Sequence, residues 1–288
     1  MTQHRTSVEV LGPWSLAISR AFWEGFPPAA LPGQRADNQL QTVFCSDTDW
    51  SRVEAQVSQR DDVAQVTVIG DGDLDAAAAQ VCRFLSLDID AREWPDVGNR
   101  DPVIADAQRQ LPGLRPCGFH SPYEAAAWTV LSQRTRIAQA AQLRSELIRR
   151  LGDHGTFPTP NRILASELDL PGRKTEYLHA VAQGAVDGVF DAGALRAMQP
   201  GKALARLEQI KGVGPFAAEL VLIRGANAPD VLAHHERRLD SEILVQYGPH
   251  ATIDEVSAAW RPFRSWAAVY LRAIREQRAH EITSAATQ

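Results

Sequence analysis

Two glycines separated by one residue interrupt two apolar helical segments in the second half of the chain. The stretch Leu207–Gly225 reads LEQIKGVGPFAAELVLIRG, and its centre, Ile210–Pro215, predicts a helix, a tight turn and a second helix. Gly212 and Gly214 tolerate backbone angles that a residue with a Cβ resists, and they let the backbone approach a ligand closely. Pro215 suits the first turn of the second helix, where its missing N–H costs little. This part of the chain must therefore fold as two helices joined by a glycine hairpin.

The start of that second helix is suited to binding phosphate. Its unpaired N–H groups and the positive end of the helix dipole attract an anion without any cationic side chain. Lys211 adds one positive charge beside the turn. The extended pattern LxxIxGVGxxxA favours this interpretation over an ordinary glycine turn between helices.

The overall charge limits how a nucleic acid could be bound. The 288 residues carry a formal net charge of −5, whereas phosphate-binding proteins are usually basic. DNA binding would therefore depend on backbone amides and a few basic side chains. The candidates for individual phosphate contacts are Arg134, Arg136, Arg173, Lys174 and Lys211.

The cysteine and histidine patterns argue against a metal cofactor. Cys45, Cys82 and Cys117 are far apart and odd in number, so they form neither a disulfide framework nor the four-thiolate set of an iron–sulfur cluster. The run His234-His235-Glu236 lacks the HExxH spacing, and consecutive residues rarely converge on one ion. We expect no iron–sulfur cluster, no side-chain metal site and no other cofactor.

The chain also lacks the apolar segments of membrane or secreted proteins. No apolar run approaches the ~20 residues that a membrane helix needs. The N-terminus, MTQHRTSVEVLG, has no long apolar core of a signal peptide. We expect a cytoplasmic protein.

The patterning predicts an α+β fold with two domains, a small antiparallel N-terminal domain (1–98) and an all-helical domain (99–288). Short β-branched runs predict strands at Val8–Gly12, Leu40–Cys45 and Val63–Gly70, and helical spacing predicts a helix at Leu74–Asp88. Ser51–Gln59 is interpreted as another helix. Proline and glycine cluster between residues 94 and 102, which favours a boundary there.

The second domain reads as helices with short connectors. Ser121–Gly152 opens with Ser-Pro and has Glu124 at a capping-box position, but it is too long for one helix and is predicted to bend or break near Ser132–Arg134. Further helices are predicted at about 160–167, 173–187, 192–197, 201–210, 215–224, 235–247, 253–259 and 263–277.

Taken together, these segments resemble the helix-hairpin-helix (HhH-GPD) DNA glycosylase superfamily, and most of all its AlkA-type 3-methyladenine DNA glycosylases. Beyond the hairpin, the resemblance is carried by Gly113–Gln133, Phe157–Ala165, Arg173–Gly188 and Trp260–Arg272, and the strand-rich N-terminus is similar to the small N-terminal domain of that family. The resemblance implies a monomeric enzyme of base excision repair that flips an alkylated purine, of the 3-methyladenine or 7-methylguanine class, out of double-stranded DNA and hydrolyses its N-glycosidic bond.

The resemblance also implies which residues carry the chemistry. The family places a carboxylate, normally Asp, at the head of the helix after the hairpin, and this position is Glu236, with Asp240 one turn later as the fallback. Such a carboxylate stabilises the oxocarbenium-like sugar and can orient the attacking water. Bifunctional members carry a lysine nucleophile two residues after the last hairpin glycine. Phe216 occupies that position, so no Schiff base and only monofunctional hydrolysis are expected.

The base pocket implied by the resemblance departs from the family. Its usual aromatic positions fall at Phe216, Leu220 and Arg272, of which one remains aromatic. Aromatic faces hold cationic alkylated bases, and an arginine is a poor neighbour for such a base. Further walls could come from Trp128, Tyr123, Phe119 and Trp266, although each is also a good core residue.

Two more expectations concern the DNA. Gln133 and Arg134 fall where the family places residues that enter the gap left by the flipped nucleotide. Arginine can stack there by its planar face. The resemblance also suggests a monovalent cation held by hairpin carbonyls, those of Ile210 and Val213.

Two alternatives stay open. A catalytically impaired protein that binds DNA or lesions would explain the Asp-to-Glu change, the depleted aromatic pocket and the negative charge. A glycosylase for another damaged base, oxidised or deaminated, would explain the pocket while keeping the hairpin and the acid. A small-molecule enzyme is disfavoured because the chain has no phosphate loop or dinucleotide fingerprint.

Overall fold

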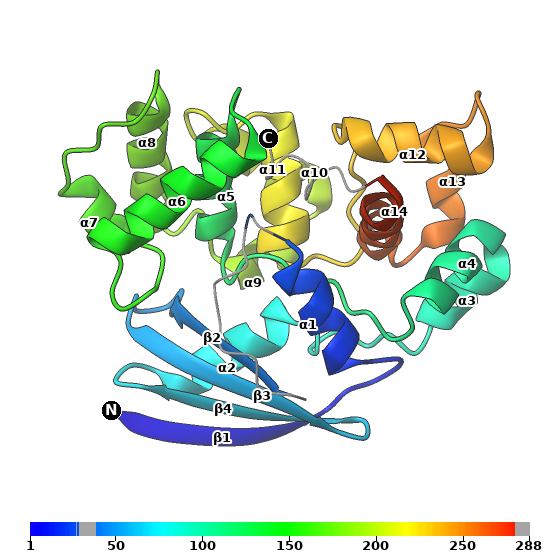
Figure 1. Cartoon of the computed structure of the whole chain (residues 1–288), viewed down its shortest axis with the longest axis horizontal. Coiled ribbons are helices and arrows are strands. Elements are labelled where there is room, and N and C mark those ends of the chain that lie inside the picture. The colour runs from blue at the N-terminus through cyan, green and yellow to red at the C-terminus, as the bar shows by residue number, and fades with distance from the viewer. Residues whose placement is uncertain (27, 29–38, 280–288) are drawn as a thin grey trace.

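The computed structural model describes residues 1–26, 28 and 39–279, and within them four strands form one antiparallel sheet (Figure 1). The strand order is β1-β4-β3-β2, so sequential strands from β2 to β4 are neighbours and β1 closes the far edge. The strands are β1 (Thr2–Glu9), β2 (Gln39–Cys45), β3 (Arg52–Arg60) and β4 (Val63–Gly70). The α+β class expected from the sequence is confirmed.

Strand β3 corrects the helix predicted at Ser51–Gln59. Val53, Ala55 and Val57 alternate with more exposed residues and are buried on one face of the sheet, which is a period of two rather than 3.6. A two-residue turn then pairs β3 with β4 in register, with Val57 opposite Val66. The first strand was also misplaced, because it ends at Glu9 instead of reaching Gly12.

Helices α1 (Leu16–Glu24) and α2 (Leu74–Phe84) pack on the sheet and join it to the helical part. The ring of His120 is stacked against Phe44 of β2 and Phe84 of α2, at centroid distances of 5.2 and 4.6 Å. Its Nε2 lies 2.8 Å from Thr42 Oγ1. The buried side chains of the sheet and of the helices therefore form one continuous core.

The segment between residues 94 and 102 is helical. Helix α3 (Trp94–Arg100) and helix α4 (Pro102–Gln110) meet at Asp101, whose carboxylate caps α4 and accepts the indole N–H of Trp260 at 2.8 Å. A proline in the first turn of a helix needs no N–H partner, which is why the prolines here start helices rather than form a linker.

The remaining helices follow the predicted order to within a few residues. The break expected near Ser132 is confirmed, because one helix ends there and the next begins at Ile137. Ser121 caps the first of them through the amide of Glu124, but the Glu124 side chain pairs with Arg144 at 3.3 Å instead of completing a capping box. The elements are α5 (Pro122–Ser132), α6 (Ile137–Leu151), α7 (Pro160–Leu164), α8 (Lys174–Val186), α9 (Ala192–Ala197), α10 (Pro200–Glu208), α11 (Pro215–Leu220), the π-helix η1 (Val221–Gly225), α12 (Arg237–Tyr247), α13 (Ile253–Val256), the 3₁₀-helix η2 (Ser257–Trp260) and α14 (Arg264–Ala279).

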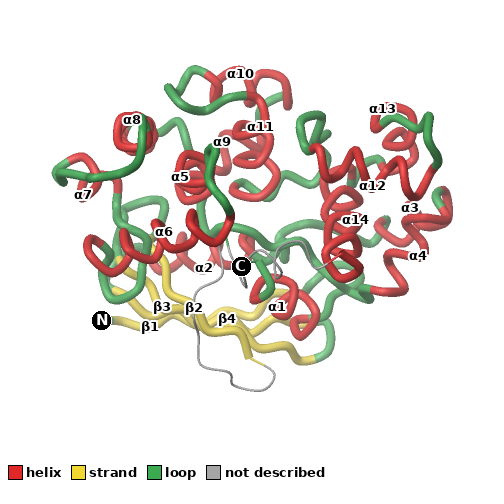
Figure 2. Tube along the Cα trace, turned by 45° about the horizontal axis from the view of Figure 1, so that its top comes forward, coloured by secondary structure: helices red, strands yellow, loops and turns green. Residues whose placement is uncertain are grey.

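The helices form two groups above the sheet. Helices α5 to α11 lie on one side, and α12 to α14 lie on the other together with α3 and α4 (Figure 1). Helix α14 packs against both α4 and α12 (Figure 2). Of the helices in the described ranges, none combines the length and apolarity needed to span a bilayer.

Candidate active site

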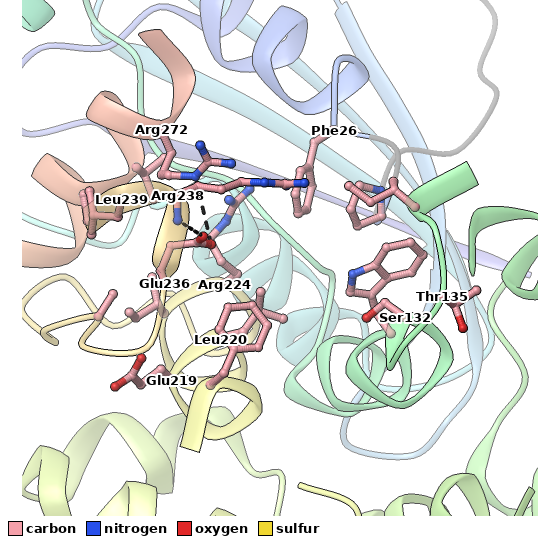
Figure 3. A pocket seen from close by; sticks show the side chains of 18 residues that line it. Phe26, Ser132, Thr135, Glu219, Leu220, Arg224, Glu236, Arg238, Leu239 and Arg272 are labelled. Carbon is pink, nitrogen blue, oxygen red and sulfur yellow. Dashed lines mark hydrogen bonds and ion pairs between the residues drawn. The ribbon is translucent and has the colours of Figure 1, made fainter. Parts of the chain in front are cut away.

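A cavity of about 260 Å³ opens where the two groups of helices face each other. One wall comes from α5, α11 and the π-helix η1, and the other from the start of α12 and from α14 (Figure 3). The residues lining it are Phe26, Pro28, Trp128, Ser132, Thr135, Ile137, Phe216, Glu219, Leu220, Ile223, Arg224, Ala233, Glu236, Arg238, Leu239, Ala268, Val269 and Arg272. The cavity therefore brings together Glu236, Phe216, Leu220, Trp128 and Arg272, as the sequence predicted.

Glu236 is the N-cap residue of α12 and lies in the cavity wall. Its Oε1 accepts the backbone N–H of Arg238 at 3.1 Å, and its Oε2 lies 4.0 Å from Nε of Arg272. Its side chain is 26% exposed, so the carboxylate is held in place and still reached from the cavity. This arrangement can present negative charge to a sugar.

The fallback Asp240 lies outside that cavity wall. It borders a more open hollow that also includes His234 and His235. Burial raises the pKa of Asp240, and the nearby carboxylates of Glu236 and Glu219 raise it further. Of the two acids, Glu236 therefore lines the cavity and Asp240 does not.

Fewer of the predicted aromatic side chains line the cavity than the sequence suggested. Phe216, which is 42% exposed, and Trp128, which is buried, both line the cavity. Tyr123, Phe119 and Trp266 are buried in the core and are absent from the part of the cavity wall that the structure describes. They pack within the protein: the hydroxyl of Tyr123 donates to the carbonyl of Pro158, and the Trp266 ring packs on Phe263.

Arginine is the main feature of the cavity that sequence reasoning missed. Within the described residues, Arg224 and Arg238 join Arg272 in the wall. Arg224 donates to the carbonyl of Cys117 at 2.7 Å, and its guanidinium lies 4.1 Å from the ring centroid of Phe26. Burial lowers the pKa of Arg224 to about 10, so it stays protonated at neutral pH.

Arg224 lies in the π-helix η1, which directly continues α11. The i to i+5 bonding of η1 adds a residue to the turn that follows α11, which shifts the face on which later side chains lie. Ile223 and Arg224 of this segment both line the cavity. Phe216, Leu220 and Arg224 are nevertheless spaced four residues apart, so the helical spacing from the predicted pocket residues is a sequence signal that could have found Arg224.

The glycine hairpin has the conformation that its sequence requires. The carbonyl of Ile210 accepts the amide of Val213 at 2.9 Å, and Gly212 has φ +93°. A Cβ on Gly212 would lie 2.5 Å from the Tyr177 ring, whereas a Cβ on Gly214 meets nothing within 4 Å. Carbonyl oxygens have a second lone pair. The turn is therefore compatible with the expected monovalent cation at Ile210 and Val213, which stays a prediction.

The turn between α5 and α6 is joined to this hairpin. Gln133 donates from Nε2 to the carbonyl of Gly212 at 2.7 Å. Arg134 is exposed and has φ +50°, a left-handed conformation that turns the chain sharply between the helices. The two predicted insertion residues therefore lie beside the predicted phosphate-binding turn.

Several basic residues do not have the environment predicted for phosphate contacts. Lys174 is buried, and its Nζ donates to the carbonyls of Val130 at 3.0 Å and Gln133 at 2.6 Å, so it caps the end of α5. Lys211 forms an ion pair with Glu176, although its side chain is 58% exposed. Arg173 also pairs with Glu176, whereas Arg134 and Arg136 are exposed.

The cysteines and histidines do not gather into a ligand set. All three cysteines are buried and free, and burial raises the pKa of Cys45 to about 11 and of Cys82 and Cys117 to about 12. In residues 1–26, 28 and 39–279, no three His, Cys, Asp or Glu side chains are grouped as metal ligands.

The glycine hairpin, the carboxylate at the head of the next helix and the cavity between two groups of helices define the fold of the helix-hairpin-helix DNA glycosylases. A 3-methyladenine DNA glycosylase from Archaeoglobus fulgidus superposes with a TM-score of 0.74 at 18% identity, covering 96% of this chain and 99% of that one. An 8-oxoguanine glycosylase/lyase from Clostridium acetobutylicum, solved with double-stranded DNA, has a TM-score of 0.66 at 13% identity and covers 92% of each chain.

Relatives of known name are similar in sequence as well. The DNA-3-methyladenine glycosylase of Bacillus subtilis is 27% identical in an alignment 207 residues long that covers 65% of this chain and 68% of that protein. DNA-3-methyladenine glycosylase 2 of Escherichia coli is 27% identical in an alignment 217 residues long that covers 69% of this chain and 73% of that protein. No family model matches the chain. The resemblance to AlkA-type 3-methyladenine DNA glycosylases is confirmed by these relatives.

Proposed function

We propose that the protein is a monofunctional DNA N-glycosylase that removes alkylated purines, of the 3-methyladenine and 7-methylguanine class, from double-stranded DNA in base excision repair. The observation that carries the proposal is the position of Glu236 in the wall of a partly aromatic cavity, on the helix that follows the glycine hairpin. The named relatives and the fold support the same activity.

The hairpin would hold the DNA backbone while the base enters the cavity. The open space around Gly214 leaves room for a phosphate to approach the backbone amides that begin α11. Gln133 and Arg134 lie next to that turn and would occupy the gap in the stack. Phe216, Leu220 and Trp128 would then contact the flipped base.

Glu236 would act on the sugar. As the N-glycosidic bond breaks, its electron pair leaves with the base, and the sugar develops positive charge that the carboxylate stabilises. Water then bonds to the sugar carbon and loses a proton, which Glu236 can accept. A cationic methylpurine leaves as a neutral base, so this step needs no acid. Phe216 offers no amine for a Schiff base, and the abasic strand stays intact.

The decisive test is base release from methylated duplex DNA, resolved by chromatography, with and without a later alkali treatment. Free 3-methyladenine or 7-methylguanine, with strand breaks after alkali alone, supports the proposal. Duplex binding without release of either base would contradict it and favour a protein that binds lesions without turnover.

A second candidate substrate class is favoured by the arginines. Arg224, Arg238 and Arg272 line the cavity among the described residues, and guanidinium groups repel a cationic base but donate to carbonyl oxygens. They would stabilise a neutral deaminated or oxidised base that leaves with negative charge. Competition between duplexes that contain hypoxanthine and 7-methylguanine decides between the two classes. An enzyme for alkylated purines should release 7-methylguanine preferentially, and an enzyme for deaminated bases should release hypoxanthine preferentially.

A further inference from the structure

The loop that delivers Glu236 to the cavity is fixed at two places. It connects η1 to α12 over residues 226–236. Its middle is held by α14: the hydroxyl of Ser265 bonds both the amide and the carbonyl of Val231, and Arg264 bonds the Asp230 carboxylate at 2.8 Å. The last of these contacts is at Val231, five residues before Glu236, so they do not by themselves determine where its carboxylate lies.

The end of the loop is held by Glu219, in the last turn of α11. Its Oε1 accepts the amide of His234 at 3.1 Å, and its Oε2 accepts the amide of His235 at 3.0 Å. Nδ1 of His235 lies 2.7 Å from Oε1. Glu219 is 4% exposed and borders the cavity (Figure 3). A buried carboxylate therefore binds the two residues that immediately precede Glu236.

These contacts require a carboxylate. Both oxygens face N–H donors, and an ionised carboxylate offers acceptors on both sides. An amide of the same shape would turn one oxygen into an NH₂ donor and leave at least one N–H of the loop without its acceptor. A buried polar group without a partner is costly, so the loop would move to satisfy it.

We propose that Glu219 is a positioning residue that sets the place of Glu236 in the cavity. The inference rests on the proposed function, since the position of Glu236 matters most if its carboxylate acts on the sugar. Helix α11 begins at Pro215, directly after the hairpin, and carries Glu219 five residues from the last hairpin glycine. One short helix therefore links the turn that would hold the DNA to the loop that carries the acid.

Glu219→Gln tests this link with little change of shape. A displacement of about 1 Å costs on the order of 100-fold in rate, so we expect single-turnover base release to fall between about 10-fold and 100-fold. Duplex affinity should stay within about threefold of the wild type, because no DNA contact is removed. Hydrogen exchange of the peptide containing residues 232–238 should become faster.

Glu242→Gln is the matched control. Glu242 is also a buried carboxylate, on α12, and it pairs with Arg278 at 2.6 Å away from the cavity. Its replacement measures the general effect of losing a buried acid. At a temperature well below unfolding, we expect it to lower the unfolding midpoint and to leave release and exchange of residues 232–238 unchanged.

Hydrogen exchange and base release together separate the positioning role of Glu219 from the proposed function. Unchanged exchange in Glu219→Gln, or a fall in release equal to that of Glu242→Gln, would overturn the positioning role. If the wild type releases no base, the proposed function fails, and the exchange comparison still decides whether Glu219 holds the loop. Faster exchange with a selective loss of release supports the inference.

Discussion

Nε of Arg272 lies 4.0 Å from Oε2 of Glu236, so a guanidinium on α14 faces the carboxylate at the head of α12. Position 272 is one where the resembled family usually has an aromatic ring. The ion pair therefore replaces a stacking surface with a charge that contacts the proposed catalytic acid. Under the proposed function, the Arg272 side chain would affect both the choice of base and the Glu236 carboxylate.

Glu236→Gln is expected to lower base release by at least about 100-fold, because a neutral amide cannot stabilise the positively charged sugar. Glu236→Asp should lose less activity than Glu236→Gln, since aspartate is also a good N-cap and retains the charge, but its shorter side chain withdraws the carboxylate by about 1 Å and still lowers the rate. Single-turnover release and duplex affinity should be measured together for both variants. Equal loss of release in the two would argue that side-chain length, and not charge, is what matters.

Arg272→Trp is expected to shift the preference towards cationic bases. It removes a positive charge and adds an aromatic face, and a desolvated cation–π contact of about 1.4–2 kcal/mol corresponds to an increase of 10-fold or more. The measurement is the ratio of 7-methylguanine to hypoxanthine release from matched duplexes. An unchanged ratio would show that Arg272 does not face the base.

Gly214→Asp is expected to weaken binding to every duplex, damaged or not. A Cβ fits there without a clash, so the added carboxylate acts by repelling phosphate rather than by unfolding the hairpin. Gly201→Asp is the control, because Gly201 is equally open but lies in α10, away from the hairpin. Duplex affinity at two salt concentrations provides the readout, and equal behaviour of the two variants would remove the hairpin from the binding surface.

Glu124 is expected to make folding stability depend on pH. Burial alone would raise its pKa, but His120 and Arg144 hold the pKa below its ordinary value of 4.5 in the folded protein. The pKa is therefore lower folded than unfolded, and the stabilisation is present above about pH 4.5 and is lost as the pH falls through the folded value. Urea unfolding at pH 7 and at pH 4 measures this loss as a decrease in the free energy of unfolding.

The variant Glu124→Gln should lose about 3–5 kcal/mol at pH 7, because Arg144 stays buried without its partner, and should show a smaller drop between pH 7 and pH 4. Glu146→Gln is the control: Glu146 pairs with Arg149 at the surface and should change stability little. A pH dependence that the Glu124 variant leaves intact would assign the effect to another carboxylate.

The sequence by itself determined the parts of the fold that depend on local chemistry. The hairpin at Gly212 and Gly214, the break after Ser132 and the order of the helices follow from turn residues, caps and periodicity, which act within a few residues of the chain. The assignment of Glu236 to the head of α12 followed from the family resemblance, which implies a carboxylate there after the hairpin. Strand β3 was predicted as a helix because its short apolar run fits the helical and the strand periodicity about equally weakly. Pairing with β4 makes it a strand.

Only the tertiary structure showed which further residues share the cavity. Arg224, Arg238 and Glu219 were not singled out in the sequence, and the packing of α11, η1, α12 and α14 brings them to the cavity. Lys174 was predicted as a phosphate contact, but its ammonium group is buried against the end of α5. Side-chain partners separated by tens of residues depend on how whole helices pack, and that information is not contained in the periodicity of any one of them.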